Sequence, residues 1–302
     1  MRIAAGMDGG GTGTTLELRK TDGAFLERKH FGPFNVNSIG SRQALERLEE
    51  IFAYIAGRGE CRAVCIGAAG ITNPETRRVM EKAAGLLGGD CKLLLMGDQE
   101  IALYGACGGE SGAILIAGTG SICMGRDQEG RSCRAGGFGH LIDDEGSGYA
   151  LGRDALCAVV RAHDGRRDHT VLTGMILEEW KASGIEELVR LVYAVPDKSH
   201  VASLAPLVER AGRMGDAAAM AVIDKGAAGL LELVLTVQRK LSLQHMSLSL
   251  MGGLLAADTL LRQQVLALLA RQAPGVELKM PLADGAAGAA MLAVREAGQT
   301  GS

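Results

Sequence analysis

Two short turns rich in glycine and threonine contain residue types that bind phosphate. The first follows an apolar strand pattern and reads Asp8-Gly9-Gly10-Gly11-Thr12-Gly13-Thr14. Glycines let backbone N–H groups approach an anion, threonine hydroxyls add donors, and the Asp8 carboxylate can hold a hydrated divalent cation. The turn lacks the Gly-Lys-Ser/Thr of a P-loop, and a strand follows it where a dinucleotide-binding turn has a helix. A plain glycine-rich hairpin would have the same composition, so the phosphate assignment needs support from elsewhere in the chain.

The second turn, Ala117-Gly118-Thr119-Gly120-Ser121, also lies between two apolar strand patterns. Alone, this sequence is compatible with any tight hairpin. It points to phosphate binding only because the chain also contains the similar first turn. A third stretch ends a strand in Gly252-Gly253 and opens a helix, where a flat adenine could lie against bare backbone. An ordinary strand-to-helix turn is equally compatible with it. Together the three stretches predict one nucleotide held from two sides.

Carboxylates at two further places could take part in the chemistry. Asp98 follows the apolar strand pattern of residues 92–96 and precedes a helix, where its side chain could point into a cleft and receive backbone N–H bonds. The alternative role for Asp98 is a helix N-cap, which does not exclude catalysis. Asp143, Asp144 and Glu145 stand beside a glycine turn, either as a binding site or as a solvated acidic loop.

Other polar and aromatic residues near these motifs are less specific. Asn35 and Asn37 follow the rigid Gly32-Pro33 turn, and an asparagine in such a loop is most often a turn residue. Phe138 is one of few aromatic residues and could pack on a ligand or on the core. We interpret His140 as structural, because no second histidine or cysteine stands at ligand spacing from it.

The spacing of apolar residues predicts an α/β protein. Residues 2–7, 14–20 and 24–29 are expected to form an antiparallel meander, with a hairpin turn at Thr21-Asp22-Gly23. The other predicted elements are helices at 42–57, 75–87, 100–107, 257–271 and 284–297, strands at 63–67, 92–96, 113–117, 121–126, 247–251 and 276–280, and a helical region over about 148–242. Residues 298–302 are expected to be loose.

The polar, glycine-rich stretch at residues 108–112 is the best candidate for a domain boundary, because the strand pattern restarts after it. We expect an N-terminal domain over 1–107, onto which the helix at 284–297 packs back, and a C-terminal domain over 108–283. Each half begins with a hairpin whose turn is rich in glycine and threonine. The halves are therefore expected to be related copies facing one another across a cleft.

Composition narrows the class of protein. The 302 residues are 47% hydrophobic and 22% charged with a formal charge of −3, which gives no field for nucleic acid or an acidic membrane. No apolar run is long enough to span a bilayer and no signal peptide is evident, so we expect a cytoplasmic protein. The seven cysteines show no paired CxxC spacing and are expected to be reduced thiols.

The order of the three glycine-rich stretches resembles the actin and sugar kinase superfamily. The stretches 97–103, 116–121 and 136–148 are further similar to the BadF/BadG family, including its N-acetylglucosamine and glucosamine kinases, and the resemblance runs from Asp8 to the last helix. It implies a two-domain actin-like ATPase fold, that is, a duplicated ribonuclease H-like α/β fold, with ATP in the cleft between domains. It also implies that Asp98 is the catalytic base and contacts the sugar.

The resemblance assigns roles to the other candidates. Mg²⁺ is expected near Asp8, and sugar contacts are expected from Asp144, from Gly120 and from an asparagine that aligns better with Asn37 than with Asn35. Phe138 stands where relatives have tryptophan. The residues expected to bind ATP and its phosphates are Gly9, Gly10, Gly11, Thr12, Gly118, Thr119, Gly120, Gly252 and Gly253.

We therefore expect an ATP-dependent kinase that phosphorylates N-acetylglucosamine or glucosamine at the 6-hydroxyl. The alternative is a nucleotide-dependent switch or activator ATPase acting on a partner protein; relatives of that kind use cysteines to hold a cluster between subunits, and no cysteine stands in a matching motif here. No nucleic acid or membrane is expected as a partner. The sequence leaves open which sugar is used and whether the chain forms a homodimer.

Overall fold

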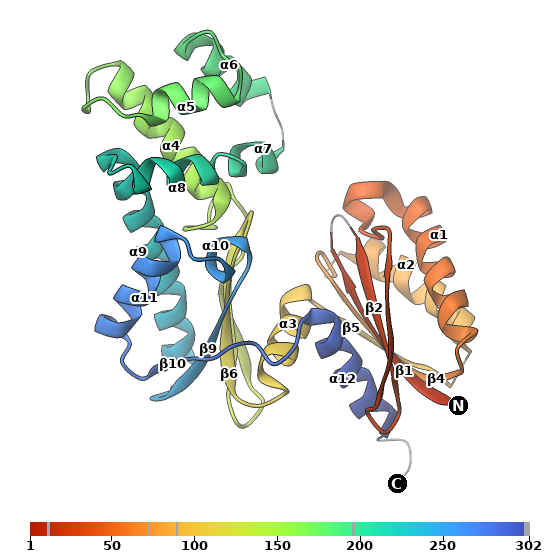
Figure 1. Ribbon diagram of the computed structural model, residues 1–302. Coiled ribbons are helices and arrows are strands. Elements are labelled where there is room, and N and C mark those ends of the chain that lie inside the picture. Colours follow the sequence, from red (N-terminus) through yellow and green to blue (C-terminus); the bar gives the residue numbers. More distant parts are fainter. Residues whose placement is uncertain (11–12, 72, 89, 195–196, 299–302) are drawn as a thin grey trace. The chain divides into compact units, whose positions relative to one another are not determined.

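The computed structural model describes residues 1–10, 13–71, 73–88, 90–194 and 197–298. The chain divides into two compact units (Figure 1). The first contains Met1–Glu110 together with Met280–Ser302, and the second contains Ser111–Lys279. The C-terminal segment thus returns to the unit in which the chain begins.

The first unit is built on a five-stranded mixed sheet with the order β3-β2-β1-β4-β5. The meander β1-β2-β3 is antiparallel, as predicted, whereas β4 and β5 continue the sheet in parallel to β1. The carboxyl ends of β1, β4 and β5 therefore share one edge. The elements are β1 Arg2–Gly9, β2 Thr14–Lys20, β3 Phe25–Phe31, α1 Val36–Ala56, β4 Glu60–Ala68, α2 Pro74–Ala84, the 3₁₀ turn Gly85–Leu87, β5 Lys92–Met96, α3 Asp98–Cys107 and α12 Gly285–Gly298.

Alternating side chains explain why helices cover both faces of this sheet. Along β1, Ile3, Ala5 and Met7 pack into the core under α1 and α2, whereas Ala4 packs into a second core with Ala289 and Ala293 of α12. A strand with a period of two and both faces buried needs a helical layer on each side. Figure 1 shows α1 and α2 on one face of the sheet and α12 on the other.

Small residues let α12 approach β1 very closely. A Cβ atom built on Gly6 would lie 2.0 Å from the backbone nitrogen of Ala290, so any larger residue would push the helix away. At its start, helix α1 contains one break, at Gly40, whose φ of 79° is not helical. The helix beyond this break corresponds to the segment predicted at 42–57.

The second unit repeats the sheet of the first. Its strand order is β10-β9-β6-β7-β8, with β6-β7-β8 antiparallel and β9 and β10 parallel to β6. Matching β6 to β1 in this sheet gives the same order and the same strand directions, so the two halves repeat one sheet fold, as predicted. The sequence analysis missed one strand, β8, whose exposed Ser132 and Arg134 hide the alternation of an edge strand.

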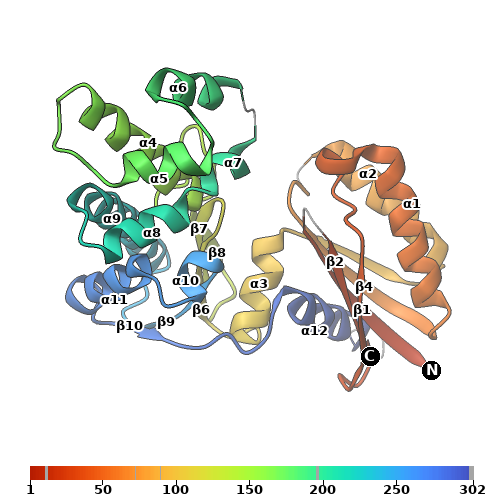
Figure 2. The same ribbon diagram turned by 45° about the horizontal axis from the view of Figure 1, so that its top comes forward.

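Helices make up most of the second unit. Figure 2 shows α9 running beside α8 and α11, and α9 packs across β7 and β8. Among the described residues, none of the helices has the length and apolar character required to cross a bilayer. The elements are β6 Gly112–Ala117, β7 Ser121–Arg126, β8 Ser132–Gly136, α4 Gly148–His163, α5 Leu172–Glu179, α6 Ile185–Ala194, α7 Lys198–Ala202, α8 Ala205–Arg213, α9 Ala217–Lys240, β9 Met246–Met251, α10 Gly253–Ala256, α11 Leu260–Gln272 and β10 Val276–Leu278.

Candidate active site

Asp8 lies at the end of β1, at the edge of the first sheet where three parallel strands finish. Burial is the main cause that raises the pKa of its carboxyl group to about 6, and the charges of Asp98 and Asp284 add to the effect. A carboxylate held among other carboxylates lowers its energy by binding a cation or a proton. Such an arrangement is typical of functional sites in α/β sheets, which lie beyond the carboxyl ends of the strands.

Asp98 is the first residue of α3 and follows β5 at the same edge. The N-cap is Gly97, and its N–H donates a hydrogen bond of 2.6 Å to Oε2 of Glu100. The alternative in which Asp98 serves as the N-cap is therefore wrong. Its side chain is exposed, which leaves the carboxylate available to a substrate.

Asp284, immediately before α12, is a member of this group that the sequence analysis missed. Its Oδ1 accepts a 3.0 Å hydrogen bond from the Ala287 N–H, and its backbone carbonyl accepts one from Gly288. A Cβ atom built on the next residue, Gly285, would lie 2.7 Å from Oδ2 of Asp8. An aspartate just before an alanine-rich helix is an N-cap signal that could have directed attention to this position.

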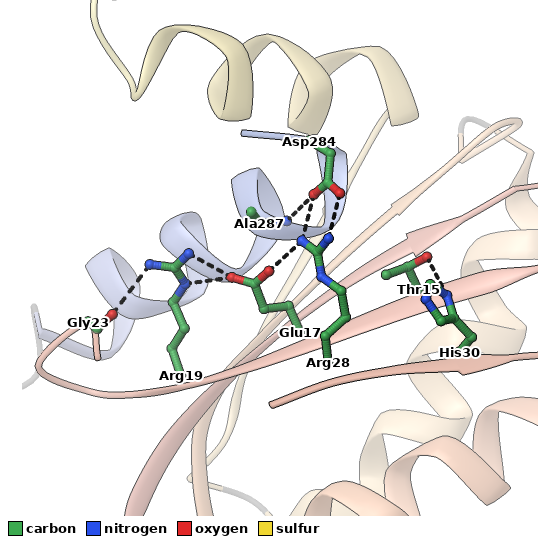
Figure 3. A network of polar contacts seen from close by, with 8 residues as sticks. All are labelled: Thr15, Glu17, Arg19, Gly23, Arg28, His30, Asp284 and Ala287. Carbon is green, nitrogen blue, oxygen red and sulfur yellow. Dashed lines mark hydrogen bonds and ion pairs between the residues drawn. The ribbon is translucent and has the colours of Figure 1, made fainter. Parts of the chain in front are cut away.

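A chain of ion pairs connects Asp284 to the meander (Figure 3). Arg28 on β3 binds both carboxylate oxygens of Asp284, at 2.8 and 2.9 Å, and also lies 2.6 Å from Oε2 of Glu17. Glu17 is 2% exposed and pairs with Arg19 through its other oxygen. Because the buried charge of Glu17 has two cationic partners, this network ties β2 and β3 to the start of α12, next to Asp8.

In the second unit, Asp144 supports the turn between β6 and β7. It is 4% exposed, so the expectation of a solvated loop does not hold for this residue. Its Oδ1 accepts a 3.2 Å hydrogen bond from the Ser121 N–H, and a Cβ on Gly120 would lie 2.9 Å from its Oδ2. Its φ of 66° is a left-handed conformation that aspartate and asparagine tolerate better than most residues.

The backbone around this turn is also held from the chain that follows Asp144. The N–H of Gly148, at the start of α4, donates to the carbonyl of Gly118 at 2.7 Å, and the Ser121 hydroxyl donates to the carbonyl of Glu145 at 2.7 Å. A Cβ built on Gly118 would meet no atom within 4 Å. The turn therefore has a rigid base and an open surface at Gly118.

The other described residues that were predicted to bind the phosphates or the adenine are either exposed or packed against protein atoms. In the first turn Gly10 is exposed and its N–H bonds to the carbonyl of Gly13, whereas a Cβ on Gly9 would overlap the ring of Phe34. Gly253 is open, while Gly252 has a φ of 83° and lies against the backbone of β6. Thr119 is exposed, and Gly11 and Thr12 lie outside the described residues.

The remaining candidates are Asn35, Asn37, Phe138 and His140. Asn37 is in the first turn of α1, but its side chain is outside the described part of the structure; the carbonyl of Asn35 accepts a hydrogen bond from Ile39. Phe138 is 63% exposed, which excludes the core, and Arg134 stacks over its ring. His140 makes an edge-to-face contact with Tyr149.

The carboxylate of Asp8 is a donor group suited to Mg²⁺. In the part of the chain that the structure describes, no three His, Cys, Asp or Glu side chains form a ready-made metal cage. Magnesium in nucleotide sites is held by one or two carboxylates together with phosphate oxygens, so such a cage is not required. The partly buried carboxylate of Asp8, with its raised pKa, fits that kind of site.

The chain is similar to known proteins over nearly its whole length. Residues 5–293 match the profile of the BadF/BadG/BcrA/BcrD ATPase family. An N-acetylmuramic acid/N-acetylglucosamine kinase from Clostridium acetobutylicum is 34% identical and covers 98% of this chain and 99% of its own. An N-acetyl-D-glucosamine kinase from Dictyostelium discoideum is 28% identical over 97% of this chain and 98% of its own.

A solved structure has the same fold. The crystal structure of a Chromobacterium violaceum protein, provisionally named an N-acetylglucosamine kinase, has a TM-score of 0.76 and 29% identity and covers 97% of this chain and 99% of its own. The two-unit α/β fold is therefore that of actin-like ATPases and sugar kinases, as expected from the motifs. With the profile matched over nearly its whole length, the chain belongs to the BadF/BadG/BcrA/BcrD ATPase family.

Proposed function

We propose that the protein is an ATP-dependent kinase that transfers the γ-phosphoryl group to the 6-hydroxyl of an amino sugar. The observation that carries the proposal is the position of Asp98. Its exposed carboxylate is not used for helix capping and lies close enough to Asp8 to raise that residue's pKa. A free carboxylate beside a cation-binding carboxylate is what phosphoryl transfer to a hydroxyl requires.

The class of enzyme follows from the relatives. Proteins 34% and 28% identical over nearly the whole chain are named as kinases of N-acetylmuramic acid or N-acetylglucosamine, and a third relative from Vibrio cholerae, 29% identical over 60% of this chain, is named a glucosamine kinase. The expected sugar kinase is thereby confirmed as a class. All three names contain a 2-amino or 2-acetamido sugar, which supports our choice of substrate.

The two turns serve phosphate binding in this proposal. In the first unit, Gly10 is exposed although its N–H is bonded to the carbonyl of Gly13, and Asp8 would hold Mg²⁺, which would neutralise charge on the phosphates. In the second unit, the open surface at Gly118 lets an anion approach the backbone of a turn that Asp144 braces through the Ser121 N–H. Gly253, the first residue of α10, leaves bare backbone for the adenine.

The chemical step depends on positioning and on one proton transfer. Asp98 accepts the proton of the sugar 6-hydroxyl as the oxygen attacks the γ-phosphorus in line with the leaving phosphate. The capped start of α3 holds Asp98 at a defined place, because Glu100 occupies the Gly97 N–H. No covalent intermediate on the protein is required.

Asp144, Gly120 and Asn37 are the proposed sugar contacts besides Asp98. Asp144 has one carboxylate oxygen on the Ser121 N–H, and each carboxylate oxygen has more than one lone pair. The same side chain can therefore brace the turn and accept a hydrogen bond from a sugar hydroxyl. This double use explains why a carboxylate is nearly buried beside a phosphate-binding turn.

The direct test is ATP consumption over a panel of sugars. We expect ADP release to require N-acetylglucosamine, glucosamine or N-acetylmuramic acid and to remain at background with glucose, with mannose and without sugar. Phosphorus–proton NMR of the product should show coupling to the C6 protons. ADP release that ignores every sugar would contradict the proposal and would favour the alternative of a partner-activating ATPase.

A further inference from the structure

Two cysteines far from the candidate active site lie in contact in the first unit. Cys61 is the second residue of strand β4, and Cys91 directly precedes β5. Because β4 and β5 are parallel neighbours with Ala63 opposite Lys92, the two cysteines come together at the amino ends of these strands. Their Sγ atoms are 3.6 Å apart.

The two thiols differ in accessibility. Cys61 is 6% exposed and its sulfur lies 3.3 Å from the carbonyl oxygen of Ala63, whereas Cys91 is only half-buried. The neighbouring Cys61 thiol lowers the pKa of Cys91, and the charge of Arg62 lowers it further. The pKa of Cys61 is raised by the same contact and by burial. Cys91 is thus the thiol that reacts first, with Cys61 as its partner.

We propose that Cys61 and Cys91 form a modification site at which a hydroperoxide produces an intramolecular disulfide. The Cys91 thiolate attacks one oxygen of the peroxide, the O–O bond breaks, and Cys91 becomes a sulfenic acid while hydroxide leaves and takes up a proton. The Cys61 sulfur then attacks the Cys91 sulfur, the S–O bond breaks, and water leaves with the Cys61 proton. Two electrons pass from the sulfurs to the peroxide, which balances the reaction.

The contact between the two sulfur atoms is the geometric basis for the bond. Ala63 pairs with Lys92, so Cys61 and Cys91 are offset by one position at the amino ends of neighbouring strands, which lie about 4.7–4.9 Å apart. The sulfur atoms need to close from 3.6 Å to about 2.05 Å, which side-chain rotation can supply. Asp8 and Asp98 are at the opposite, carboxyl ends of the strands, so the bond would form without altering the site.

The consequence of oxidation is a more stable first unit. The bond would join residues 30 positions apart and enclose most of β4 and all of α2. A cross-link of this span restricts the unfolded chain, and native disulfides commonly stabilise by a few kcal/mol, so we expect the melting temperature of the oxidised protein to rise by about 3–8 °C. ATP turnover should change less than twofold.

The experiment treats the reduced full chain with hydrogen peroxide, blocks remaining thiols with iodoacetamide after denaturation, and measures intact mass and linked peptides. We expect five of the seven cysteines to be alkylated and a peptide joining residues 61 and 91, both reversed by dithiothreitol. Cys91→Ser should abolish the link. Cys61→Ala should instead leave a sulfenic acid on Cys91 that dimedone captures.

Cys157 supplies the matched control, because it is an exposed cysteine in the second unit. Cys157→Ser should leave the 61–91 link and the rise in melting temperature unchanged. Circular dichroism shows whether each variant is folded. The decisive measurement, the 61–91 disulfide after peroxide treatment, needs only the wild-type protein. The proposal is overturned if peroxide oxidises folded wild type without producing a 61–91 disulfide, or if the bond forms only in denaturant.

Discussion

The two units share one sheet topology, yet the turns at the ends of β1 and β6 lie in different surroundings. The first turn follows Asp8, which is surrounded by the charges of Asp98 and Asp284. The second turn rests on a hydrogen-bonded base in which Asp144 is the buried carboxylate. The repeated sheet thus has a glycine-rich hairpin in each unit. Under the proposed function, their different neighbours suit the first for cation and proton chemistry and the second for binding.

The largest expected effect comes from removing the proton acceptor of the first unit. Asp98→Asn should lower the rate of sugar phosphorylation by about 10²- to 10⁴-fold, because the amide keeps the shape of the side chain but cannot act as the base. A coupled assay of ADP release measures this loss. Glu100→Gln, two residues along the same helix, is the control and should retain nearly full activity, since an amide oxygen can still accept the Gly97 N–H.

The same substitution in the second unit should act on binding. Asp144→Asn should weaken sugar binding by about 10- to 100-fold, the usual effect of losing a hydrogen bond to a charged group, with a smaller change in the maximal rate. Asparagine tolerates the left-handed backbone at this position, so the variant should fold. Isothermal titration with the sugar provides the measurement. Asp143→Asn is the control, because the side chain of Asp143 accepts a hydrogen bond from the nearby Phe138 N–H and not from the turn that Asp144 supports. Equal losses in both variants would contradict the role of Asp144.

The ion pairs behind the first turn should affect stability. Arg28→Met removes one partner of the 2%-exposed Glu17 and frees Asp284, so the free energy of unfolding should fall by about 1–3 kcal/mol. Urea denaturation measures this change. Arg42→Met breaks the exposed Arg42–Glu46 pair and should cost less than about 0.5 kcal/mol. Similar small losses in the two variants would show that the network does not hold the start of α12.

Asp8 should make the metal-free protein less stable as pH rises. Its folded pKa of about 6 exceeds the ordinary value of 3.8, so the folded protein binds the proton more tightly than the unfolded chain. Its contribution to stability is therefore fully present below pH 4 and is lost as pH rises through about 6. In EDTA, the free energy of unfolding of Asp8→Asn should not fall in this way as pH rises. At pH 7 it should exceed that of wild type by about 1–3 kcal/mol. If the difference in the free energy of unfolding between wild type and variant is the same at pH 4 and pH 7, this prediction is wrong.

The smallest expected effect concerns the open surface of the second turn. Gly118→Val should weaken ATP binding by about tenfold while the chain remains folded, because a Cβ there meets no protein atom but would occupy the space of a phosphate oxygen. Gly252→Ala gives the contrast. Its Cβ would lie 2.3 Å from the Ala117 carbonyl oxygen, so that variant should lose stability. Unchanged ATP affinity in folded Gly118→Val would remove this turn from the nucleotide site.

The sequence predicted the hairpins and the parallel strands well, because their apolar patterns and turn residues are local signals. β5 was predicted at its observed bounds, residues 92–96, and the meander of the first unit was recognised from its turn at Gly23. β8 was missed because two of its five side chains are exposed and polar. Which residues of an edge strand are buried depends on the strand beside it, and the local sequence does not identify that strand.

The candidate site was predicted only where a motif marks it. Asp8, Asp98 and Asp144 each stand beside a glycine turn or a strand end. Asp284 could not be assigned to the site in this way, because its nearness to Asp8 arises when α12 packs on β1 from the far end of the chain. Arg28 and Glu17 were missed for the same reason, since charged residues in a meander carry no local sign of a long-range ion pair.

The central claim, that the first unit performs the proton transfer and the second unit contributes to holding the sugar, is tested most directly by one paired measurement. Sugar dissociation constants and maximal phosphorylation rates would be determined side by side for Asp98→Asn and Asp144→Asn with N-acetylglucosamine and saturating ATP. The account predicts that Asp98→Asn loses at least about 10²-fold in rate with less than about fivefold in affinity, and that Asp144→Asn shows the reverse pattern. The same pattern in both variants, or near-normal turnover in Asp98→Asn, would contradict it.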